Sequence, residues 1–152
     1  MRILLTTAAA ALAAACATQA PTYQARSESS RYGYSEMQVQ PNRLRISYNG
    51  DTVTPRETVE TYLLYRSAES TLQRGFDYFI VVAHDADENT RYDAMGGRPR
   101  LGGVSYREIS NHTAMAEIIM FEGDTPPPLA NVYDARIVVA NLQSRVVSST
   151  GR

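Results

Sequence analysis

Apolar and polar residues alternate over two neighbouring stretches of the chain. Residues 34–39 alternate weakly, whereas Leu44, Ile46 and Tyr48 are separated by arginine and serine. Side chains two positions apart lie on the same face of a strand. Because residues 40–42 read Gln-Pro-Asn, which favours a turn, the pattern predicts a β-hairpin with one buried face.

A long helix is predicted next, over about residues 54–74. Thr54, Pro55 and Glu57 stand at the N-cap, first-turn and capping-box positions. Gly75 stands where a left-handed residue commonly ends a helix. Apolar side chains recur at helical spacing in between, at Val59, Tyr62, Leu63, Ala68 and Leu72.

Three more strands are expected after this helix. The continuous apolar run 76–83 predicts a central strand covered on both faces. A loop is predicted at 84–101. The stretches 103–109 and 113–121 then predict a second hairpin, which turns at 110–112.

The last predicted element is a helix over about residues 131–143. Asn131 heads a series of apolar positions at helical spacing, which favours this helix, with a strand at 137–139 as the alternative. Residues 148–152 are expected to form a frayed tail.

Together these elements predict a single α+β domain over residues 33–147. Its mixed sheet of about four to five strands is expected to pack against the helix at 54–74 and the one at 131–143. A chain of 152 residues has room for one modest core and not for two full domains.

The N-terminus has the layout of a signal peptide at 1–15. Arg2 supplies a positive charge, and residues 3–12 are uncharged and mostly apolar, a stretch too short to span a bilayer. The sequence Leu12-Ala13-Ala14-Ala15-Cys16 resembles the lipobox of bacterial lipoproteins. The resemblance implies cleavage before Cys16 and diacylation of its thiol. The alternative is an ordinary secretory signal that leaves Cys16 without lipid.

Residues 16–32 are interpreted as the lipidated Cys16 followed by a flexible tether. The tether is polar, without periodicity, and reaches about 22 Å as a random coil. Ala17 and Thr18 follow the cysteine in place of aspartate, which resembles lipoproteins sorted to the outer membrane. We therefore expect a protein anchored in the bacterial envelope on the periplasmic side, with the outer membrane as its site.

Three motifs resemble an uncharacterised family of small proteobacterial envelope lipoproteins. They stand here as Gly33-Tyr34-Ser35-Glu36, Tyr62-Leu63-Leu64-Tyr65-Arg66-Ser67-Ala68-Glu69 and Gly75-Phe76-Asp77-Tyr78-Phe79. The resemblance is good over residues 33–83 and loose elsewhere. It implies location and fold, but no reaction and no catalytic residue.

The composition narrows the function classes. The net charge of −1 is spread without a basic run, which argues against a nucleic-acid partner. All fifteen basic residues are arginine, so neither a Schiff-base lysine nor a P-loop lysine is present. The single cysteine rules out an intramolecular disulfide.

One cluster in the loop 84–101 is a candidate ligand site. It comprises one imidazole and several oxygen donors, at His84, Asp85, Asp87, Glu88 and Asn89. A calcium loop beginning at Asp85 needs glycine at its sixth and glutamate at its twelfth position, where Thr90 and Gly96 stand. A solvated acidic loop is therefore favoured, and no metal or cofactor is predicted.

Other polar residues have a structural and a functional interpretation. Arg66 and Glu69 could form a buried functional pair, but a surface ion pair is favoured. Tyr23, Tyr32 and Tyr34 could face a membrane interface or a partner. A hydrolytic triad would need distant residues to meet, for instance Ser105, His112 and Asp93.

The favoured hypothesis is a non-enzymatic envelope lipoprotein. Its domain would bind an envelope protein partner or serve a structural or stress-related role. The first alternative is a module that binds a small ligand or a divalent cation through loop 84–101, and a hydrolase is the weaker one.

Overall fold

The computed structural model describes residues 23–94 and 106–150, with side chains at 23–88 and 111–146. The predicted signal peptide, Cys16 and Ser105 lie outside the described residues. Five strands form one sheet in the order β1-β2-β4-β3-β5. The strands are β1 (Gly33–Gln40), β2 (Arg43–Asn49), β3 (Tyr78–Ala94), β4 (Tyr106–Phe121) and β5 (Tyr133–Asp134), and the helices are α1 (Arg56–Gln73) and α2 (Ala135–Thr150).

The predicted α+β class is confirmed, but the sheet is antiparallel throughout, not mixed. β2 and β3 run parallel to each other, because each is antiparallel to β4. The unit β2-α1-β3 is therefore a crossover with β4 inserted between its two strands. Sequence patterns showed strand, helix and strand, but not the later strand that separates them.

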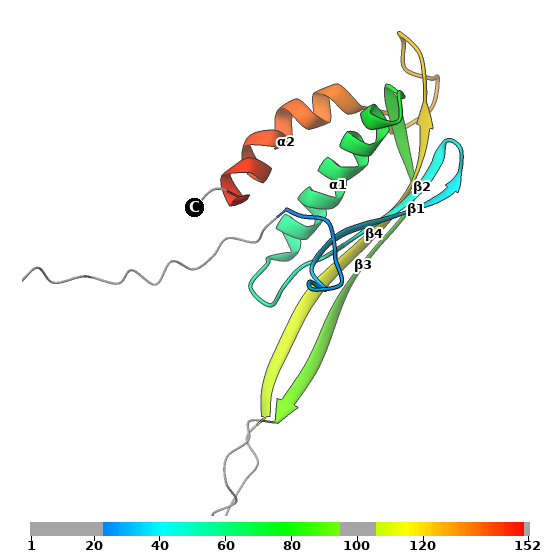
Figure 1. Cartoon of the computed structure of the whole chain (residues 1–152). Helices are drawn as coiled ribbons and strands as arrows, with labels where there is room; N and C mark the ends of the chain where they lie inside the picture. Colours follow the sequence, from blue (N-terminus) through cyan, green and yellow to red (C-terminus); the bar gives the residue numbers. More distant parts are fainter. Residues whose placement is uncertain (1–22, 95–105, 151–152) are drawn as a thin grey trace, which may run out of the picture.

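The core lies between the sheet and α1. The predicted inward face of β2 is confirmed, since Leu44 and Ile46 are 0% exposed and Tyr48 is 2% exposed. On α1, Val59 and Leu63 face the sheet, while Ala68, on the other side of the helix, is also fully buried. α2 covers that other side, so sheet, α1 and α2 form successive layers (Figure 1).

The two ends of α1 differ in how well the sequence predicted them. Thr54 does not cap the helix: its hydroxyl exchanges hydrogen bonds with Asp51, and the helix begins after Pro55 without a side-chain cap. The C-terminal prediction is confirmed. Gly75 has φ +84°, and the N–H groups of Gly75 and Phe76 donate to the carbonyls of Leu72 and Thr71, the Schellman arrangement.

β3 and β4 are far longer than predicted. Residues 84–94 continue β3, and 110–112 lie within β4, so the predicted loop is wrong over 84–94 and the predicted hairpin is wrong. The pairing of β2 with β4 ends at Thr113, so residues 106–112 pair only with β3. This two-stranded ribbon extends past the end of β2 (Figure 1). The residues of this ribbon do not pack in the core. Their sequence is therefore polar, as is typical of a loop.

The structure also revises the C-terminal region. The predicted helix at 131–143 begins later, at Ala135, and continues to Thr150 through part of the predicted frayed tail. Asn131 has φ +56° and lies in a turn before β5. Asp134 is the actual cap, because its carboxylate accepts hydrogen bonds from the N–H groups of Arg136 and Ile137.

The predicted tether at 16–32 is wrong from Tyr23 onward. The Tyr23 ring packs against Tyr62 and Tyr65 of α1 and against Tyr34 of β1. Residues 24–26 run beside β1, where the N–H of Tyr34 donates to the carbonyl of Gln24. We call residues 23–32 the N-terminal strap. The strap belongs to the domain, because Tyr23 contacts aromatic residues that are distant from it in sequence.

Candidate functional site

The candidate residues at 84–89 lie on β3, where strand geometry separates them. Side chains alternate between faces along a strand. His84 and Glu88 therefore share the face that carries α1, and Asp85 and Asp87 share the opposite face, as their register with β4 confirms. Asn89 is opposite Asn111, and its side chain lies outside the described residues. The cluster that the cation hypothesis required does not form.

Metal-ligating groups show the same dispersal. Among the side chains that the structure describes, no three His, Cys, Asp or Glu residues are close enough to hold a metal ion. The hydrolytic triad does not assemble either. Asp93 and His112 lie opposite Arg107 and Glu88, five positions apart along the ribbon. That separation is about 17 Å at roughly 3.3 Å per residue.

His84 lines a cleft between α1 and β3. The cleft has a volume of about 320 Å³, and its walls are largely apolar, formed by Leu63, Leu64, Val81 and Tyr133. The Tyr133 ring stacks on Phe79 with the centroids 5.1 Å apart. A volume near 300 Å³ is at the lower end of the range for ligand pockets. The cleft can therefore hold a few apolar groups.

The polar groups around the cleft are mostly engaged. The hydroxyl of Ser67 donates to the carbonyl of Leu63 at 2.9 Å. The carboxylate of Glu60 accepts from Arg56 at 2.9 Å. His84 is exposed on the rim. The cleft thus offers apolar contact surface and one imidazole, without an assembled catalytic group.

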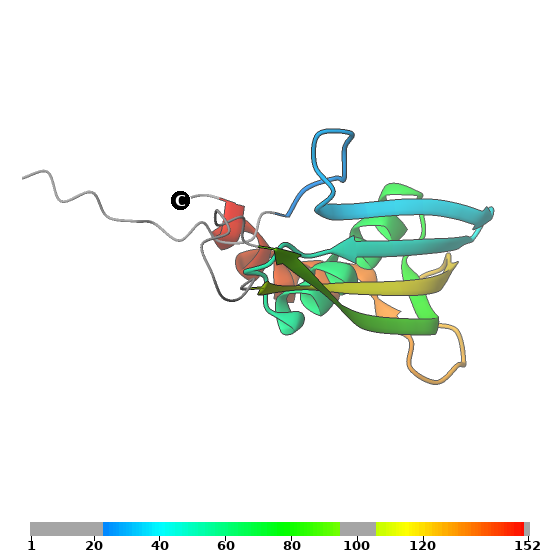
Figure 2. The same ribbon diagram turned by 90° about the horizontal axis from the view of Figure 1, so that it is seen from below.

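The outer edge of β3 lies beside this cleft. β5 pairs with β3 only at Tyr78 and Phe79, and no other described strand pairs with that edge. Figure 2 shows β3 at the border of the sheet. Val82 is an extra residue in a bulge and is 43% exposed. From Ala83 to Ala94 the pairing with β4 is regular, so β3 presents a long edge that has no strand partner among the described residues.

A second polar cluster lies between β1 and α1 and is centred on Arg66. Its guanidinium donates to Glu36 and Glu69 and lies 4.2 Å from the centre of the Tyr34 ring. Glu36 also accepts from Ser70 and from Arg74. The Arg66 side chain is only 12% exposed, so the favoured surface ion pair is wrong: Arg66 and Glu69 belong to a largely buried network.

The electrostatics of this cluster favour the charged carboxylate. Burial by itself would raise the pKa of Glu36, but the hydrogen bond from Ser70 and the charge of Arg66 outweigh it and lower that pKa. Burial and the hydrogen bond to Glu69 together raise the pKa of Tyr23. Every buried side-chain nitrogen and oxygen in the described regions has a partner. This cluster is therefore a structural clamp for the N-terminal strap.

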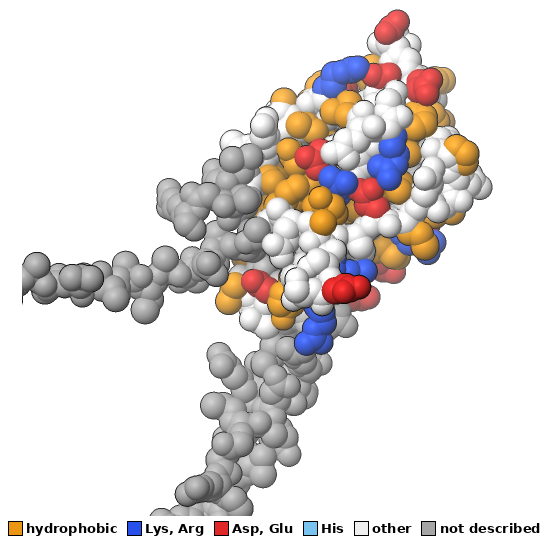
Figure 3. Space-filling model, viewed as in Figure 1, with side chains coloured by type: hydrophobic (Ala, Val, Ile, Leu, Met, Phe, Trp, Pro, Cys, Tyr) orange, Lys and Arg blue, Asp and Glu red, His pale blue; other side chains and the backbone are white. Residues whose placement is uncertain are grey.

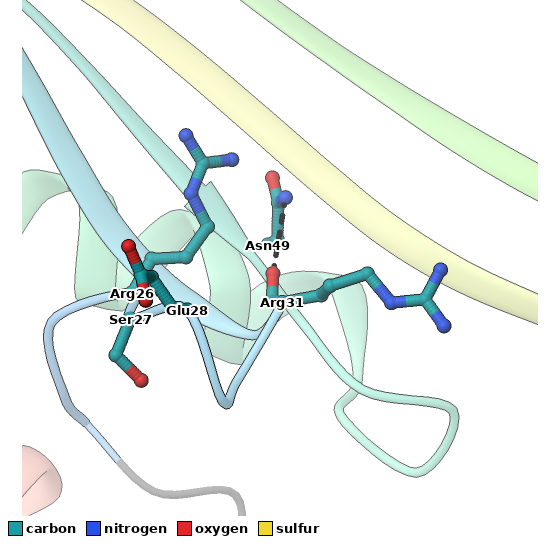
Figure 4. A pocket seen from close by; sticks show the side chains of 5 residues that line it. All are labelled: Arg26, Ser27, Glu28, Arg31 and Asn49. Carbon is teal, nitrogen blue, oxygen red and sulfur yellow. Dashed lines mark hydrogen bonds between the residues drawn. The ribbon is translucent and has the colours of Figure 1, made fainter.

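The strap itself borders a wide, open hollow. It has a volume of about 640 Å³ and is lined by Arg26, Ser27, Glu28, Arg31 and Asn49. The amide of Asn49 donates to the backbone carbonyl of Arg31 at 3.3 Å. Figure 4 shows the guanidinium groups of Arg26 and Arg31 pointing in different directions. The hollow has no point where its charges converge, so it is a weaker candidate than the β3 edge.

The face of the sheet away from α1 carries one more charged group. Glu117 is 7% exposed and accepts hydrogen bonds from Arg43 and Arg45. The hydrogen bond from Arg45, together with that from Arg43, lowers the pKa of Glu117 although burial opposes the shift. Both carboxylate oxygens are engaged, so this group stabilises the pairing of β2 with β4.

The sequence did not predict the β3 edge, because the charged residues from 84 to 94 are typical of a loop. No glycine or proline occurs from residue 76 to residue 95, a length that fits one long strand better than a strand and a loop. Likewise, residues 104–121 contain neither. That absence of turn-forming residues was the available signal.

Comparison with protein-family models, with curated proteins and with solved structures finds no match to this chain. The resemblance to small proteobacterial envelope lipoproteins therefore stays a prediction from the sequence. None of the helices among the described residues is long and apolar enough to cross a membrane. The space-filling view shows apolar and charged side chains interspersed on the face it presents (Figure 3).

Proposed function

We propose that this protein is an exported lipoprotein, anchored through Cys16 on the periplasmic side of a bacterial envelope membrane, with the outer membrane as its site. Its domain serves as a non-enzymatic module that binds another envelope protein. The anchor is supported by the positively charged start, the short apolar stretch and the alanines before Cys16. Two or three acyl chains give effectively permanent attachment, because each buried CH₂ contributes about 0.8 kcal/mol.

The observation that carries the proposal is the position of Tyr23. Tyr23 is fixed against α1 and lies seven positions after Cys16. At up to 3.6 Å per residue, the intervening chain spans at most about 25 Å. A lipid on Cys16 would therefore hold the domain next to the membrane, where envelope proteins concentrate.

The described polar groups favour an interaction role over catalysis, because they are paired with one another or lie far apart. The buried carboxylates of Glu36 and Glu117 are fully engaged with arginines. The candidates for hydrolysis and for cation binding do not converge. Among the described residues, the longest strand edge without a strand partner is that of β3, and backbone groups support binding without chemistry.

Metabolic labelling tests the anchor. Cells expressing the full chain are fed an alkyne fatty acid, and the protein is followed by click labelling and membrane fractionation. We expect label and membrane association in the wild type and loss of both in Cys16→Ser. Thr18→Ser, a neighbouring variant that keeps the cysteine, is the matched control and should stay labelled. Unlabelled wild-type protein whose N-terminus is an unmodified Cys16 would instead establish an ordinary secretory signal.

A further inference from the structure

The uncovered edge of β3 has the features of a strand-addition site. Its regular part begins at Ala83, after the bulge, and runs to Ala94. Unpaired N–H and C=O groups on such an edge accept an additional strand from another chain. Native proteins commonly protect such edges with proline, bulges or charges. β3 contains no proline, its bulge at Val82 precedes the regular part, and its charges remain as the selective feature. The backbone here is available over a length that fits a short extended peptide.

The acidic side chains on this strand determine which charge is favoured in an added strand. Asp85 and Asp87 are exposed on the face away from α1, and neither forms an ion pair with another described residue. Glu88 adds a third exposed carboxylate on the other face. Opposite charges across neighbouring strands stabilise pairing, and like charges destabilise it. The edge therefore favours a strand that carries lysine or arginine.

The same charges disfavour a second copy of this chain. Antiparallel pairing of two β3 strands centred between 85 and 87 would place Asp85 and Asp87 beside those of the other copy. Shifting the centre toward the start of the strand is blocked, because β5 already occupies the edge at Tyr78 and Phe79. Pairing centred on Glu88 would set Asp85 opposite Arg91, but it would set the two Glu88 residues opposite each other. A different polypeptide of opposite charge meets none of these like charges.

The cleft between α1 and β3 can accommodate side chains of an added strand that point to the α1 side of the sheet. Val81 and His84 lie on the α1 side of β3, and Leu64 and Tyr133 complete the apolar wall. Because side chains alternate, a strand with basic residues toward Asp85 and Asp87 would direct its other residues to the α1 side, and the one beside His84 would reach this cleft. A small apolar residue at that position would bury surface against Leu64 and Val81.

We propose that the edge of β3 from Ala83 onward binds an extended segment of an envelope protein as an added strand. In that segment basic residues alternate with apolar ones. Its basic side chains lie beside Asp85 and Asp87, and its apolar side chain beside His84 enters the cleft between α1 and β3. This inference rests on the proposed interaction role, but it is independent of the lipid on Cys16.

The test uses a fluorescent nine-residue peptide that alternates lysine with valine. Binding to the full chain is followed by anisotropy. The protein is held in phosphatidylcholine nanodiscs, whose neutral surface does not attract the peptide, if Cys16 carries lipid, and in buffer if it does not. We expect saturable binding, weakened roughly threefold to tenfold in the double variant Asp85→Asn/Asp87→Asn. Glu122→Gln/Asp124→Asn removes the same charge from exposed positions after β4 and should bind like the wild type.

Backbone methylation distinguishes strand addition from simple charge attraction. One peptide is N-methylated at every lysine and another at every valine. Only alternate amides of an added strand face its neighbour, so one of the two peptides should lose binding and the other should keep it. Replacing the valines by serine should weaken binding, because the cleft then gains no apolar contact.

Several results would overturn the proposal. These are absence of saturable binding, equal binding by both methylated peptides and the parent, and equal weakening in the two double variants. The outward-facing amides of 83–94, which do not bond to β4, should exchange rapidly before peptide is added. Their protection would also overturn the proposal, since another segment or copy would then occupy the edge. Fatty-acid labelling of Cys16 is read separately, so failure of the anchor and failure of the edge site are distinguishable.

Discussion

The phenol of Tyr23 donates a hydrogen bond of 2.6 Å to Oε2 of Glu69, a residue 46 positions further along the chain. The same carboxylate oxygen accepts from Arg66 at 2.8 Å. The Tyr23 ring also makes edge contacts with Tyr62 and Tyr65, with centroids 5.5 and 5.3 Å apart. One side chain thus joins the start of the domain to the middle of α1.

Removing the hydroxyl of Tyr23 should cost less than removing its ring. Tyr23→Phe loses a hydrogen bond to a charged acceptor, and the free energy of unfolding should fall by about 1–2 kcal/mol. Tyr23→Ala also loses the aromatic contacts, and the loss should reach about 3 kcal/mol. Urea unfolding of both variants measures the difference. Equal losses would show that the ring does not contribute to stability.

Alkaline pH should destabilise the protein through Tyr23. Burial, reinforced by the hydrogen bond to Glu69, raises the pKa of Tyr23 in the folded state above the value of about 10 for an unfolded tyrosine. The unfolded chain therefore loses its proton first, and stability falls as pH rises above 10. Tyr48 and Tyr65, with raised pKa values of their own, contribute in the same direction.

The urea midpoint measured at pH 9, 10 and 11 tests this dependence. Tyr23→Phe has no proton to lose at this position, so its midpoint should fall less steeply between pH 10 and 11 than that of the wild type. Parallel curves for the two proteins would contradict a raised pKa at Tyr23.

Neutralising Glu36 should be strongly destabilising. Glu36→Gln leaves Arg66 and Arg74 without their shared carboxylate, and Arg66 is 12% exposed. Breaking a buried ion pair costs about 3–5 kcal/mol, and because Glu69 still pairs with Arg66 we expect about 2–3 kcal/mol here. Glu60→Gln removes an exposed pair with Arg56 and should cost under about 0.5 kcal/mol. Chemical unfolding at pH 7 compares the two.

Glu36 should also contribute to the loss of stability of the folded protein at acid pH. Burial opposes ionisation, but the hydrogen bond from Ser70 and the charge of Arg66 lower the pKa of Glu36 below its usual 4.5. Its contribution is present above the unfolded pKa and is lost as pH falls through the lower folded value. Between pH 5 and pH 3 the wild type should therefore lose more stability than Glu36→Gln. A steeper loss of stability in Glu36→Gln than in the wild type would contradict a lowered pKa of Glu36 in the folded protein.

Two glycines should differ in their response to alanine. A Cβ at Gly75 meets no atom within 4 Å, so Gly75→Ala costs only the strain of φ +84°, about 1–2 kcal/mol. A Cβ at Gly33, where φ is +115°, would lie 2.3 Å from the backbone oxygen of Gln24. Gly33→Ala must therefore also displace the strap. Thermal unfolding should show a clearly larger loss for Gly33→Ala, and similar losses would contradict the close approach of the strap.

Features that depend on a few neighbouring residues were predicted well from the sequence. The C-terminus of α1 followed from Gly75, because a left-handed position after a helix depends on a few adjacent residues. The inward face of β2 followed from Leu44, Ile46 and Tyr48 for the same reason. Thr54 shows the limit of such reasoning, since Asp51 lies within reach and takes the hydroxyl that the helix could have used.

The candidate site was predicted in composition but not in arrangement. His84, Asp85, Asp87 and Glu88 were correctly singled out as exposed polar residues, but they do not form a loop. Whether a polar segment is loop or strand depends on a partner strand, and β4 comes more than ten residues later in the chain. Local polarity cannot reveal that pairing.

The sequence alone determined the α+β class, the position of α1 and the inward face of β2, because periodicity and turn-forming residues act over a few positions. Only the tertiary structure decided that β4 separates β2 from β3, that Tyr23 is fixed to Glu69, and that no described strand pairs with the edge of β3 after Phe79. These features join residues tens of positions apart. Their stability comes from packing and pairing in three dimensions, which no local pattern specifies.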